Sequence, residues 1–385
     1  MTDHLPHEDL GREWAARRGT RRLLHVDTAA CGRTSDAVRA RIAEHLVAES
    51  DWGGYVAQDD AEEEIQLAQA RLGELLGFAG DDVVFVESAS AAVAQLLDAW
   101  PLRPGEKIWA VRSEWGPNLA AFADRGLTVD WLDTDDNGEI DLEALGRRLR
   151  TQRPSAVHLT SAASHRALRQ PIGEVVALCD PVEVPVILDT AQALCQIEVA
   201  PGAAAVYGTG RKWLCGPRGV GYLAVREPWQ SRLIPVAPAL SAAVWSAGGD
   251  RPVRRLGSRE AFAAGRLGLG VAVREYVELG PARIRERLHG IAVALRTALA
   301  DLPDWQLRDP IDAPGAMVVL APRSADLDVP AARAELLRRG VLCTASQRER
   351  APHDMTGYLL RLSPHVEVTA EDIDTIAKHL GEIGS

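Results

Sequence analysis

Short apolar runs alternate with helical stretches from residue 83 onward, and this alternation constrains the fold more than any other feature. Seven runs have the length and composition of strands: 83–86, 107–111, 127–132, 156–159, 184–188, 204–207 and 221–225. Strands separated by helices predict βαβ units around a buried, largely parallel sheet. The last two runs are close enough in sequence to include an antiparallel strand. We therefore expect an α/β protein.

The pattern changes beyond about residue 255. A long helical region at 259–300 is followed by strand-like pieces near 317–320, 341–343 and 358–362 and a final helix over 371–383. This order is typical of a smaller α+β domain. Earlier in the chain, helices are predicted at 35–49 and 60–77. We predict three parts: an N-terminal arm at 1–25 that packs with the small domain, a large domain at 26–255 and a small C-terminal domain at 256–385.

The composition of the 385-residue chain is that of an ordinary water-soluble protein, with 46% hydrophobic and 25% charged residues. A net charge of −11 argues against nucleic acid or an anionic membrane as the main partner. The N-terminus is polar and acidic, unlike a signal peptide, and no apolar run is long enough to cross a bilayer. We expect a cytoplasmic protein.

The five cysteines are scattered, and no Cys-x-x-Cys pair occurs. An odd, dispersed set is typical of reduced thiols rather than of a disulfide framework or a zinc site. The ten histidines show no metal-ligand spacing with them. The sequence therefore predicts no structural metal.

Lysine is rare in this chain. Only three lysines occur among 43 lysine and arginine residues, and one of them, Lys212, lies in the glycine-rich segment 208–221. Arginine replaces lysine in most surface roles, but a guanidinium stays protonated and does not act as an amine nucleophile. Lys107 and Lys378 fit surface positions. Lys212 is therefore the candidate for chemistry that needs an amine.

A carboxylate is expected close to that amine. Asp189 directly follows the strand-like run 184–188, and Lys212 follows the next run, 204–207. Ligands of open α/β sheets collect at the carboxyl ends of strands, so adjacent strands would deliver both groups into one crevice. Pyridoxal phosphate chemistry uses such a pair, a lysine that holds the cofactor and an acid that keeps its pyridine nitrogen protonated. Asp189 alone would fit an ordinary strand-end acid equally well.

The same edge of the sheet offers an anchor for a phosphate. The segment Glu87-Ser-Ala-Ser-Ala-Ala follows the strand 83–86 and opens a helix, so Ala89 and Ser90 would present backbone N–H groups. Thr209 and Arg211, just before Lys212, complete the anchor. Serine is also a common helix cap, so this segment is a weak signal by itself.

Four segments together carry a family resemblance: His25-Val-Asp-Thr-Ala-Ala, Leu188-Asp-Thr-Ala-Gln192, the run 208–221 and Arg361-Leu-Ser-Pro-His365. They resemble the class V aminotransferases, which are fold-type I pyridoxal-phosphate enzymes, over nearly the whole chain. The resemblance implies that Lys212 forms the Schiff base, Asp189 pairs with the pyridinium and Gln192 contacts the ring hydroxyl. It places Ala89, Ser90, Thr209 and Arg211 at the phosphate, with Arg211 standing where relatives carry histidine.

The resemblance also assigns residues around the ring and the substrate. Trp115 falls where relatives hold a ring over the cofactor, although a core tryptophan is an equal alternative. Either Ser164 or His165 would face the cofactor or the substrate. Ser258 lies in a loop that reaches the partner subunit's phosphate, which implies a homodimer with shared sites. Arg361 would bind the substrate α-carboxylate, with an exposed ion-pair arginine as the alternative.

Further segments narrow the resemblance within the family: Trp52-Gly-Gly-Tyr-Val, Glu114-Trp-Gly-Pro-Asn-Leu-Ala, His158-Leu-Thr with Ala163-Ser-His-Arg, and Glu349-Arg-Ala-Pro. They most closely resemble the carbon–sulfur lyases that cleave hercynylcysteine sulfoxide in ergothioneine biosynthesis. It implies β-elimination from a small amino-acid sulfoxide, giving a sulfenate, pyruvate and ammonia. The trimethylammonium group of this substrate would suit an aromatic surface, for which Trp52 and Tyr55 are candidates. The alternatives are a class V aminotransferase, a cysteine desulfurase, for which 344–360 lacks a cysteine, and a non-catalytic scaffold.

Overall fold

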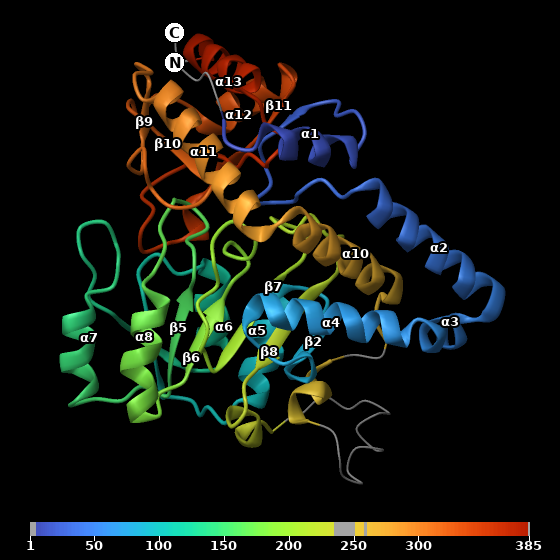
Figure 1. Cartoon of the computed structure of the whole chain (residues 1–385). Coiled ribbons are helices and arrows are strands. Elements are labelled where there is room, and N and C mark those ends of the chain that lie inside the picture. The colour runs from blue at the N-terminus through green and yellow to red at the C-terminus, as the bar shows by residue number, and fades with distance from the viewer. Residues whose placement is uncertain (1–4, 235–250, 258–259, 384–385) are drawn as a thin grey trace.

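The computed structural model describes residues 5–234, 251–257 and 260–383 (Figure 1). A seven-stranded mixed sheet lies between helices, and a second, antiparallel sheet lies beside it in the C-terminal part. The prediction of an α/β fold of the fold-type I kind, with a smaller α+β part, is confirmed.

The large sheet has the strand order β2-β8-β7-β6-β5-β3-β4. All of its neighbouring pairs are parallel except those of β8, which runs antiparallel to β2 and β7, as the close spacing of the last two runs indicated. The strands are β2 (Val83–Val86), β3 (Lys107–Ala110), β4 (Thr128–Trp131), β5 (Ala156–Thr160), β6 (Val186–Asp189), β7 (Ala205–Thr209) and β8 (Gly221–Val225).

Both faces of this sheet are buried. Successive side chains of a strand point to opposite faces, so each strand contributes to both cores. In β2, Val83 and Phe85 join one core cluster, whereas Val84 and Val86 join another. The first cluster includes side chains of α4 (Glu62–Leu76), α7 (Leu142–Leu149), α8 (Ile172–Cys179) and α10 (Ala263–Leu279). The second includes side chains of α5 (Ala89–Ala99) and α6 (Gly116–Asp124).

The C-terminal part is built on a four-stranded antiparallel sheet of order β12-β13-β10-β9. The predicted helical region at 259–300 contains two helices, α10 and α11, which meet at Gly280 with φ +90°, a value that favours glycine. The remaining elements are β9 (Trp305–Leu307), β10 (Val318–Pro322), β11 (Val341–Leu342), β12 (Thr344–Ser346), β13 (Leu359–Leu362), α11 (Pro281–Leu299), α12 (Val329–Arg338) and α13 (Ala370–Ile383).

The N-terminal segment contacts the C-terminal part. Strand β1 (Leu24–His25) pairs in parallel with β11, and Leu5 packs in the core cluster beneath the small sheet. Helix α1 (Glu8–Ala16) precedes it. The three-part division at residues 25 and 255 stays a prediction.

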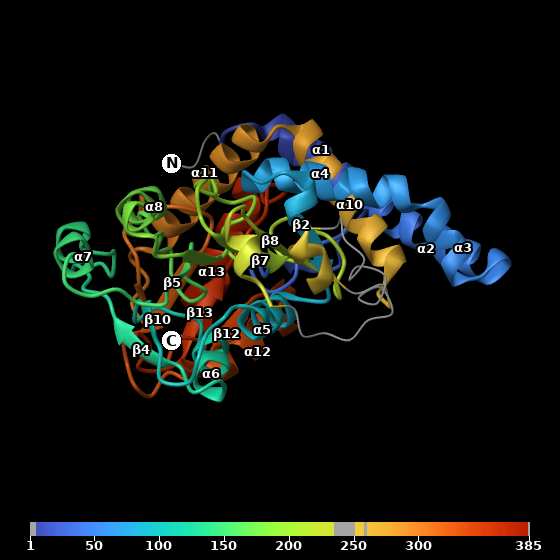
Figure 2. The ribbon, with the colours of Figure 1, turned by 90° about the horizontal axis from the view of Figure 1, so that it is seen from below.

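Two helices extend away from the body of the protein. Figures 1 and 2 show α2 (Asp36–Trp52) and α3 (Gly54–Asp60) projecting beyond the sheet and its covering helices. Helix α2 starts where Ser35 accepts a hydrogen bond from the Val38 N–H at 3.1 Å, a typical N-cap. Its outer end therefore presents side chains to solvent.

Candidate active site

A cavity opens where β5, β6 and β7 end, and most of the predicted site residues lie on its wall. Nine predicted residues line it together with four others: Ala89, Ser90, Trp115, Ser164, Asp189, Gln192, Thr209, Arg211 and Lys212, with Ser88, Thr160, Ala162 and Ala191. Because parallel strands deliver their carboxyl ends to one edge, residues that are far apart in sequence meet here.

Lys212 lies three residues beyond the end of β7. Burial lowers the pKa of its amine from 10.5 to about 7, against the opposing charge of Asp189 and with the positive charges of Arg211, Arg361 and Arg350. An amine with this pKa is largely neutral slightly above pH 7. The chain thus holds Lys212 ready to act as a nucleophile or a base.

Asp189 is fixed at the end of β6 by two hydrogen bonds. The N–H of Ala191 donates to Oδ1 at 2.8 Å, and Nδ2 of Asn118 donates to Oδ2 at 3.2 Å. Burial raises the pKa of this carboxyl, while Lys212 and the two donors act in the opposite direction. The carboxylate is therefore oriented into the cavity before any ligand arrives.

A buried polar network supports Asp189 from behind, and the sequence did not indicate it. Asn118 also donates to Oε1 of Glu114 at 2.9 Å, and Nδ1 of His158 donates to Oε2 of Glu114 at 3.0 Å. The hydroxyl of Tyr207 donates to Nε2 of His158 at 2.9 Å. Glu114, His158 and Tyr207 are fully buried. These hydrogen bonds satisfy the buried carboxylate of Glu114, which would otherwise be costly, and Asn118 connects it to Asp189 at the cavity.

The start of α5 forms one wall. Ser88 is its N-cap and accepts from the Ala91 N–H at 3.1 Å, so the N–H groups of Ala89 and Ser90 have no intrahelical partner and point to the cavity side. Residue 221 must be glycine, because a Cβ there would lie 2.8 Å from the backbone of Ser88. This close approach brings β8 and the helix start together and leaves donors suited to an anion.

Trp115 and Ser164 face this cavity, whereas His165 does not line it. Trp115 is half-buried at the cavity wall rather than in the core. The hydroxyl of Ser164 is buried without a hydrogen-bond partner. His165 donates from Nε2 to Oδ2 of Asp354 at 2.6 Å, away from the cavity. Of the two alternatives left open by the sequence, the structure places Ser164 at the site.

Arg361 is fully buried beside these residues, so it is not an exposed ion-pair arginine. It donates to the carbonyl oxygen of Ser164 at 2.7 Å and lies 3.7 Å from Oδ1 of Asp27. Its Nε and one terminal nitrogen have no hydrogen-bond partner. Two donors of a charged fork thus remain for an anionic ligand.

Trp52 and Tyr55 do not lie at the cavity of their own chain. They are 73% and 66% exposed at the junction of α2 and α3, and neither lines the cavity that contains Lys212. The Tyr55 hydroxyl donates to Glu260 at 2.5 Å. Ser258, predicted to reach a partner's phosphate, lies outside the described residues.

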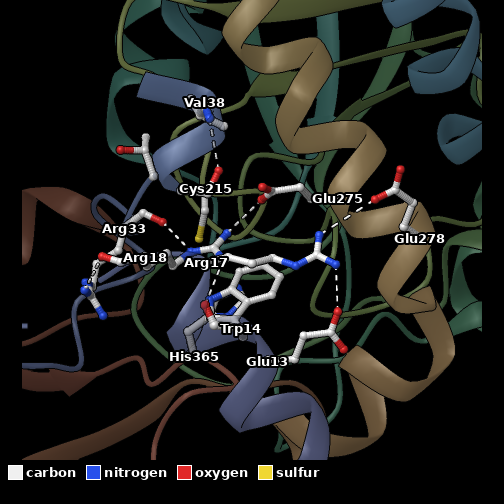
Figure 3. A network of polar contacts seen from close by, with 12 residues as sticks. Glu13, Trp14, Arg17, Arg18, Arg33, Val38, Cys215, Glu275, Glu278 and His365 are labelled. Carbon is white, nitrogen blue, oxygen red and sulfur yellow. Dashed lines mark hydrogen bonds and ion pairs between the residues drawn. The ribbon is translucent and has the colours of Figure 1, made fainter. Parts of the chain in front are cut away.

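Trp14 of the N-terminal helix packs against His365, which in turn contacts the segment that carries Lys212 (Figure 3). Trp14 stacks on His365 with ring centroids 4.3 Å apart, and the guanidinium of Arg18 lies 3.6 Å from the Trp14 ring. Nε2 of His365 donates to the carbonyl oxygen of Trp213 at 3.0 Å. Burial lowers the pKa of His365 to about 3, so this ring stays neutral.

Gln192 lines the cavity and contacts Trp213, the residue that accepts the hydrogen bond of His365. Nε1 of Trp213 donates to its Oε1 at 2.9 Å, and its Nε2 donates to the carbonyl oxygen of Ala29 at 3.0 Å. One amide hydrogen of Gln192 is left for a ligand. The residue after Lys212 is thereby tied to the segment that follows Asp189.

The part of the chain that the structure describes contains no cluster of three or more His, Cys, Asp or Glu side chains placed to hold a metal ion. No described helix is long and apolar enough to cross a membrane. All five cysteines are free.

Comparison with known proteins agrees with the fold. The family model described as "Aminotransferase class-V" matches residues 25–376, and the chain belongs to this family, whose members are pyridoxal-phosphate enzymes. A relative from Mycobacterium tuberculosis (strain CDC 1551 / Oshkosh), named "Probable hercynylcysteine sulfoxide lyase", is 37% identical over 97% of this chain and 93% of its own length.

Solved structures share the fold at low identity. The apo cysteine desulfurase from Thermococcus onnurineus NA1 has a TM-score of 0.83 and 17% identity, over 100% of this chain and 99% of that chain. A mutant of C-DES, with glycine covalently linked to its PLP cofactor, has a TM-score of 0.81 and 15% identity, over 98% of this chain and 99% of that chain.

Proposed function

We propose that this protein is a pyridoxal-phosphate-dependent carbon–sulfur lyase that cleaves hercynylcysteine sulfoxide by β-elimination. The observation that carries the proposal is one cavity that joins the amine of Lys212, the carboxylate of Asp189 and the open N-terminus of α5. The 37% identity to the mycobacterial relative supports the substrate.

The side chains at the cavity fit this cofactor. The free N–H groups of Ala89 and Ser90, with Thr209 and Arg211, would hold its phosphate. Asp189 would pair with the ring nitrogen, and the remaining amide hydrogen of Gln192 would reach the ring hydroxyl. The hydroxyls of Thr160 and Ser164 are buried at this cavity without partners, as expected where a polar ligand binds. Lys212 would hold the cofactor covalently.

The bound cofactor would supply an electron sink for the pair released when a bond at the substrate Cα breaks. Asp189 would keep a proton on the ring nitrogen, and Arg361 would hold the α-carboxylate. Once the substrate amine has displaced it, the Lys212 amine would take the proton from Cα. The Cβ–S bond then breaks, and its electron pair leaves with the sulfenate. The remaining three-carbon fragment adds water to give pyruvate and ammonia.

The position of the cysteines supports a lyase over a desulfurase. A desulfurase of this family would need a nucleophilic thiolate in the C-terminal part. Cys343 is buried there, and burial raises its pKa from 9.0 to about 12, so the thiol stays protonated. Residues 344–360 contain no other cysteine.

We also propose a homodimer in which each cavity is completed by the partner. The exposed apolar side chains of the projecting helices support this proposal, because a free surface of this kind is costly in water. They are Leu46, Val47, Trp52, Tyr55 and Val56. In such a dimer Trp52 and Tyr55 would act at a substrate site that one chain alone does not offer them.

The test is to incubate the purified protein and pyridoxal phosphate with hercynylcysteine sulfoxide. The proposal expects pyruvate and ammonia in equal amounts without an added 2-oxoacid. Reciprocal amino exchange with a 2-oxoacid would instead identify an aminotransferase.

A further inference from the structure

Arg350 lies behind Trp115 of the cavity wall and has no role in the proposed function. It ends a single 3-10 turn (Arg348–Arg350) between β12 and β13. Its guanidinium lies 5.0 Å from the centroid of the Trp115 ring, and Trp115 lines the cavity. A cation placed over an aromatic face is attracted to it. The contact positions a charge from the C-terminal part beside the site.

The turn that carries Arg350 is fixed against the segment of Trp115. A Cβ at Gly116 would lie 2.0 Å from the carbonyl oxygen of Glu349, so these two backbones are in direct contact. Only glycine at residue 116 permits this approach. The position of Arg350 over Trp115 thus follows from backbone packing and does not depend on side-chain rotamers alone.

The guanidinium of Arg350 has unused donors. Its Nε is buried without a hydrogen-bond partner, and no carboxylate among the described residues forms an ion pair with it. Burial is also the main cause that lowers its pKa, although an arginine remains charged. A half-buried cation without a partner is costly, and a bound anionic or strongly polar oxygen would relieve that cost.

Three arginines act on the amine of Lys212: Arg211, Arg350 and Arg361. Arg350 and Arg361 each disfavour protonation of Lys212, and Arg350 is, after burial, the largest cause that lowers the pKa of Arg361. On the proposed function, Arg211 is assigned to the cofactor phosphate and Arg361 to the α-carboxylate. Arg350 then has no assigned ligand group, and a cysteine sulfoxide has one further polar oxygen, the one on sulfur.

We infer that Arg350 is a specificity-determining residue that donates hydrogen bonds to the sulfinyl oxygen of the substrate. The inference rests on the proposed function and names how that site selects the oxidised substrate. As the Cβ–S bond breaks, its electron pair leaves with the sulfur, and negative charge grows on the sulfenate oxygen. A fixed guanidinium stabilises that charge without transferring a proton. No oxidant or reductant is needed.

The test compares hercynylcysteine sulfoxide with its thioether, which differs only by the oxygen on sulfur. R350M removes the guanidinium, and R348M on the exposed part of the same turn is the matched control. We expect R350M to lower kcat/KM for the sulfoxide roughly 10²-fold. The Ki of the thioether as a competitive inhibitor should change less than about threefold, because it lacks the contacted oxygen. R348M should change neither.

Other outcomes separate the inference from the function it rests on. Equal losses for sulfoxide and thioether would overturn the inference and assign Arg350 to a shared group or to structure. Unchanged values for both would also overturn it. R350K, which keeps the charge but loses the planar fork, should recover part of the loss if the variant folds normally. A wild-type protein that forms no pyruvate from the sulfoxide would refute the proposed function itself.

Discussion

The edge of the large sheet and the projecting helices differ in how completely one chain builds them. At the sheet edge, β6 and β7 deliver Asp189 and Lys212 to one cavity, and buried hydrogen bonds hold Asp189 in place. At the tip of α2 and α3, Trp52 and Tyr55 are 73% and 66% exposed. A site at strand ends is determined by the topology of one chain, whereas an exposed aromatic surface needs a further partner to become a site.

The largest effect is expected at the sheet edge. D189N keeps the shape of the side chain but removes the charge that would hold a proton on the ring nitrogen. We expect kcat to fall on the order of 10²–10³-fold, as for other losses of electrostatic stabilisation. Pyruvate formation measures it. D180N, on an exposed carboxylate before β6, is the control and should retain full activity.

An effect of intermediate size is expected in the pH dependence of cofactor uptake by Lys212, at the same edge of the sheet. Burial disfavours the charged amine and lowers its pKa to about 7. The neutral fraction then rises about tenfold between pH 6 and pH 8 and changes little above that. The rate at which cofactor-free protein takes up pyridoxal phosphate, followed by absorbance, should rise accordingly. A rate that keeps increasing up to pH 10 would indicate an ordinary exposed lysine.

A smaller effect is expected behind Asp189. N118A removes the donor shared by Asp189 and Glu114, and one such hydrogen bond contributes about 1 kcal/mol, or about fivefold. We expect this loss in kcat, with KM nearly unchanged and the pH profile shifted, because Asn118 positions Asp189 without touching substrate. The exposed Asn137 gives the control, N137A. An effect on KM alone would contradict a positioning role.

The smallest effect is expected at the projecting helices. The double variant W52A/Y55A should raise KM for the betaine substrate about twofold per ring, or about fourfold together, and leave a cysteine sulfoxide without the trimethylammonium group unaffected. L67A, at an exposed apolar position on α4 outside that surface, is the control. Equal losses on both substrates would remove these rings from substrate recognition.

Much of the large sheet could be predicted because its strands have strong local patterns. The runs 83–86 and 221–225 match β2 and β8 residue for residue. The three-residue β9 and the helix α12 gave no comparable pattern. The boundary between α10 and α11 could not be located within the predicted helical region, because glycine within an apolar helical pattern is also tolerated.

The site was predictable to the extent that it lies in contiguous motifs. Lys212, Asp189 and the start of α5 follow directly from the segments that carry them. Glu114 and Arg350 lie in segments that carry the resemblance, but their interactions give no such signal, because their partners are distant in sequence: His158 is 44 residues from Glu114, and Trp115 contacts Arg350 through space. The chain order does not reveal these pairs, and the fold does.

Chemical mapping of the lysines tests whether Lys212 is the residue that holds the cofactor covalently. The purified protein is reduced with borohydride in the presence of pyridoxal phosphate, and its peptides are analysed by mass spectrometry. Because the chain has three lysines, the attachment point is unambiguous. We predict one pyridoxyl group, on Lys212. A group on Lys107 or Lys378, or no stable adduct, would contradict it.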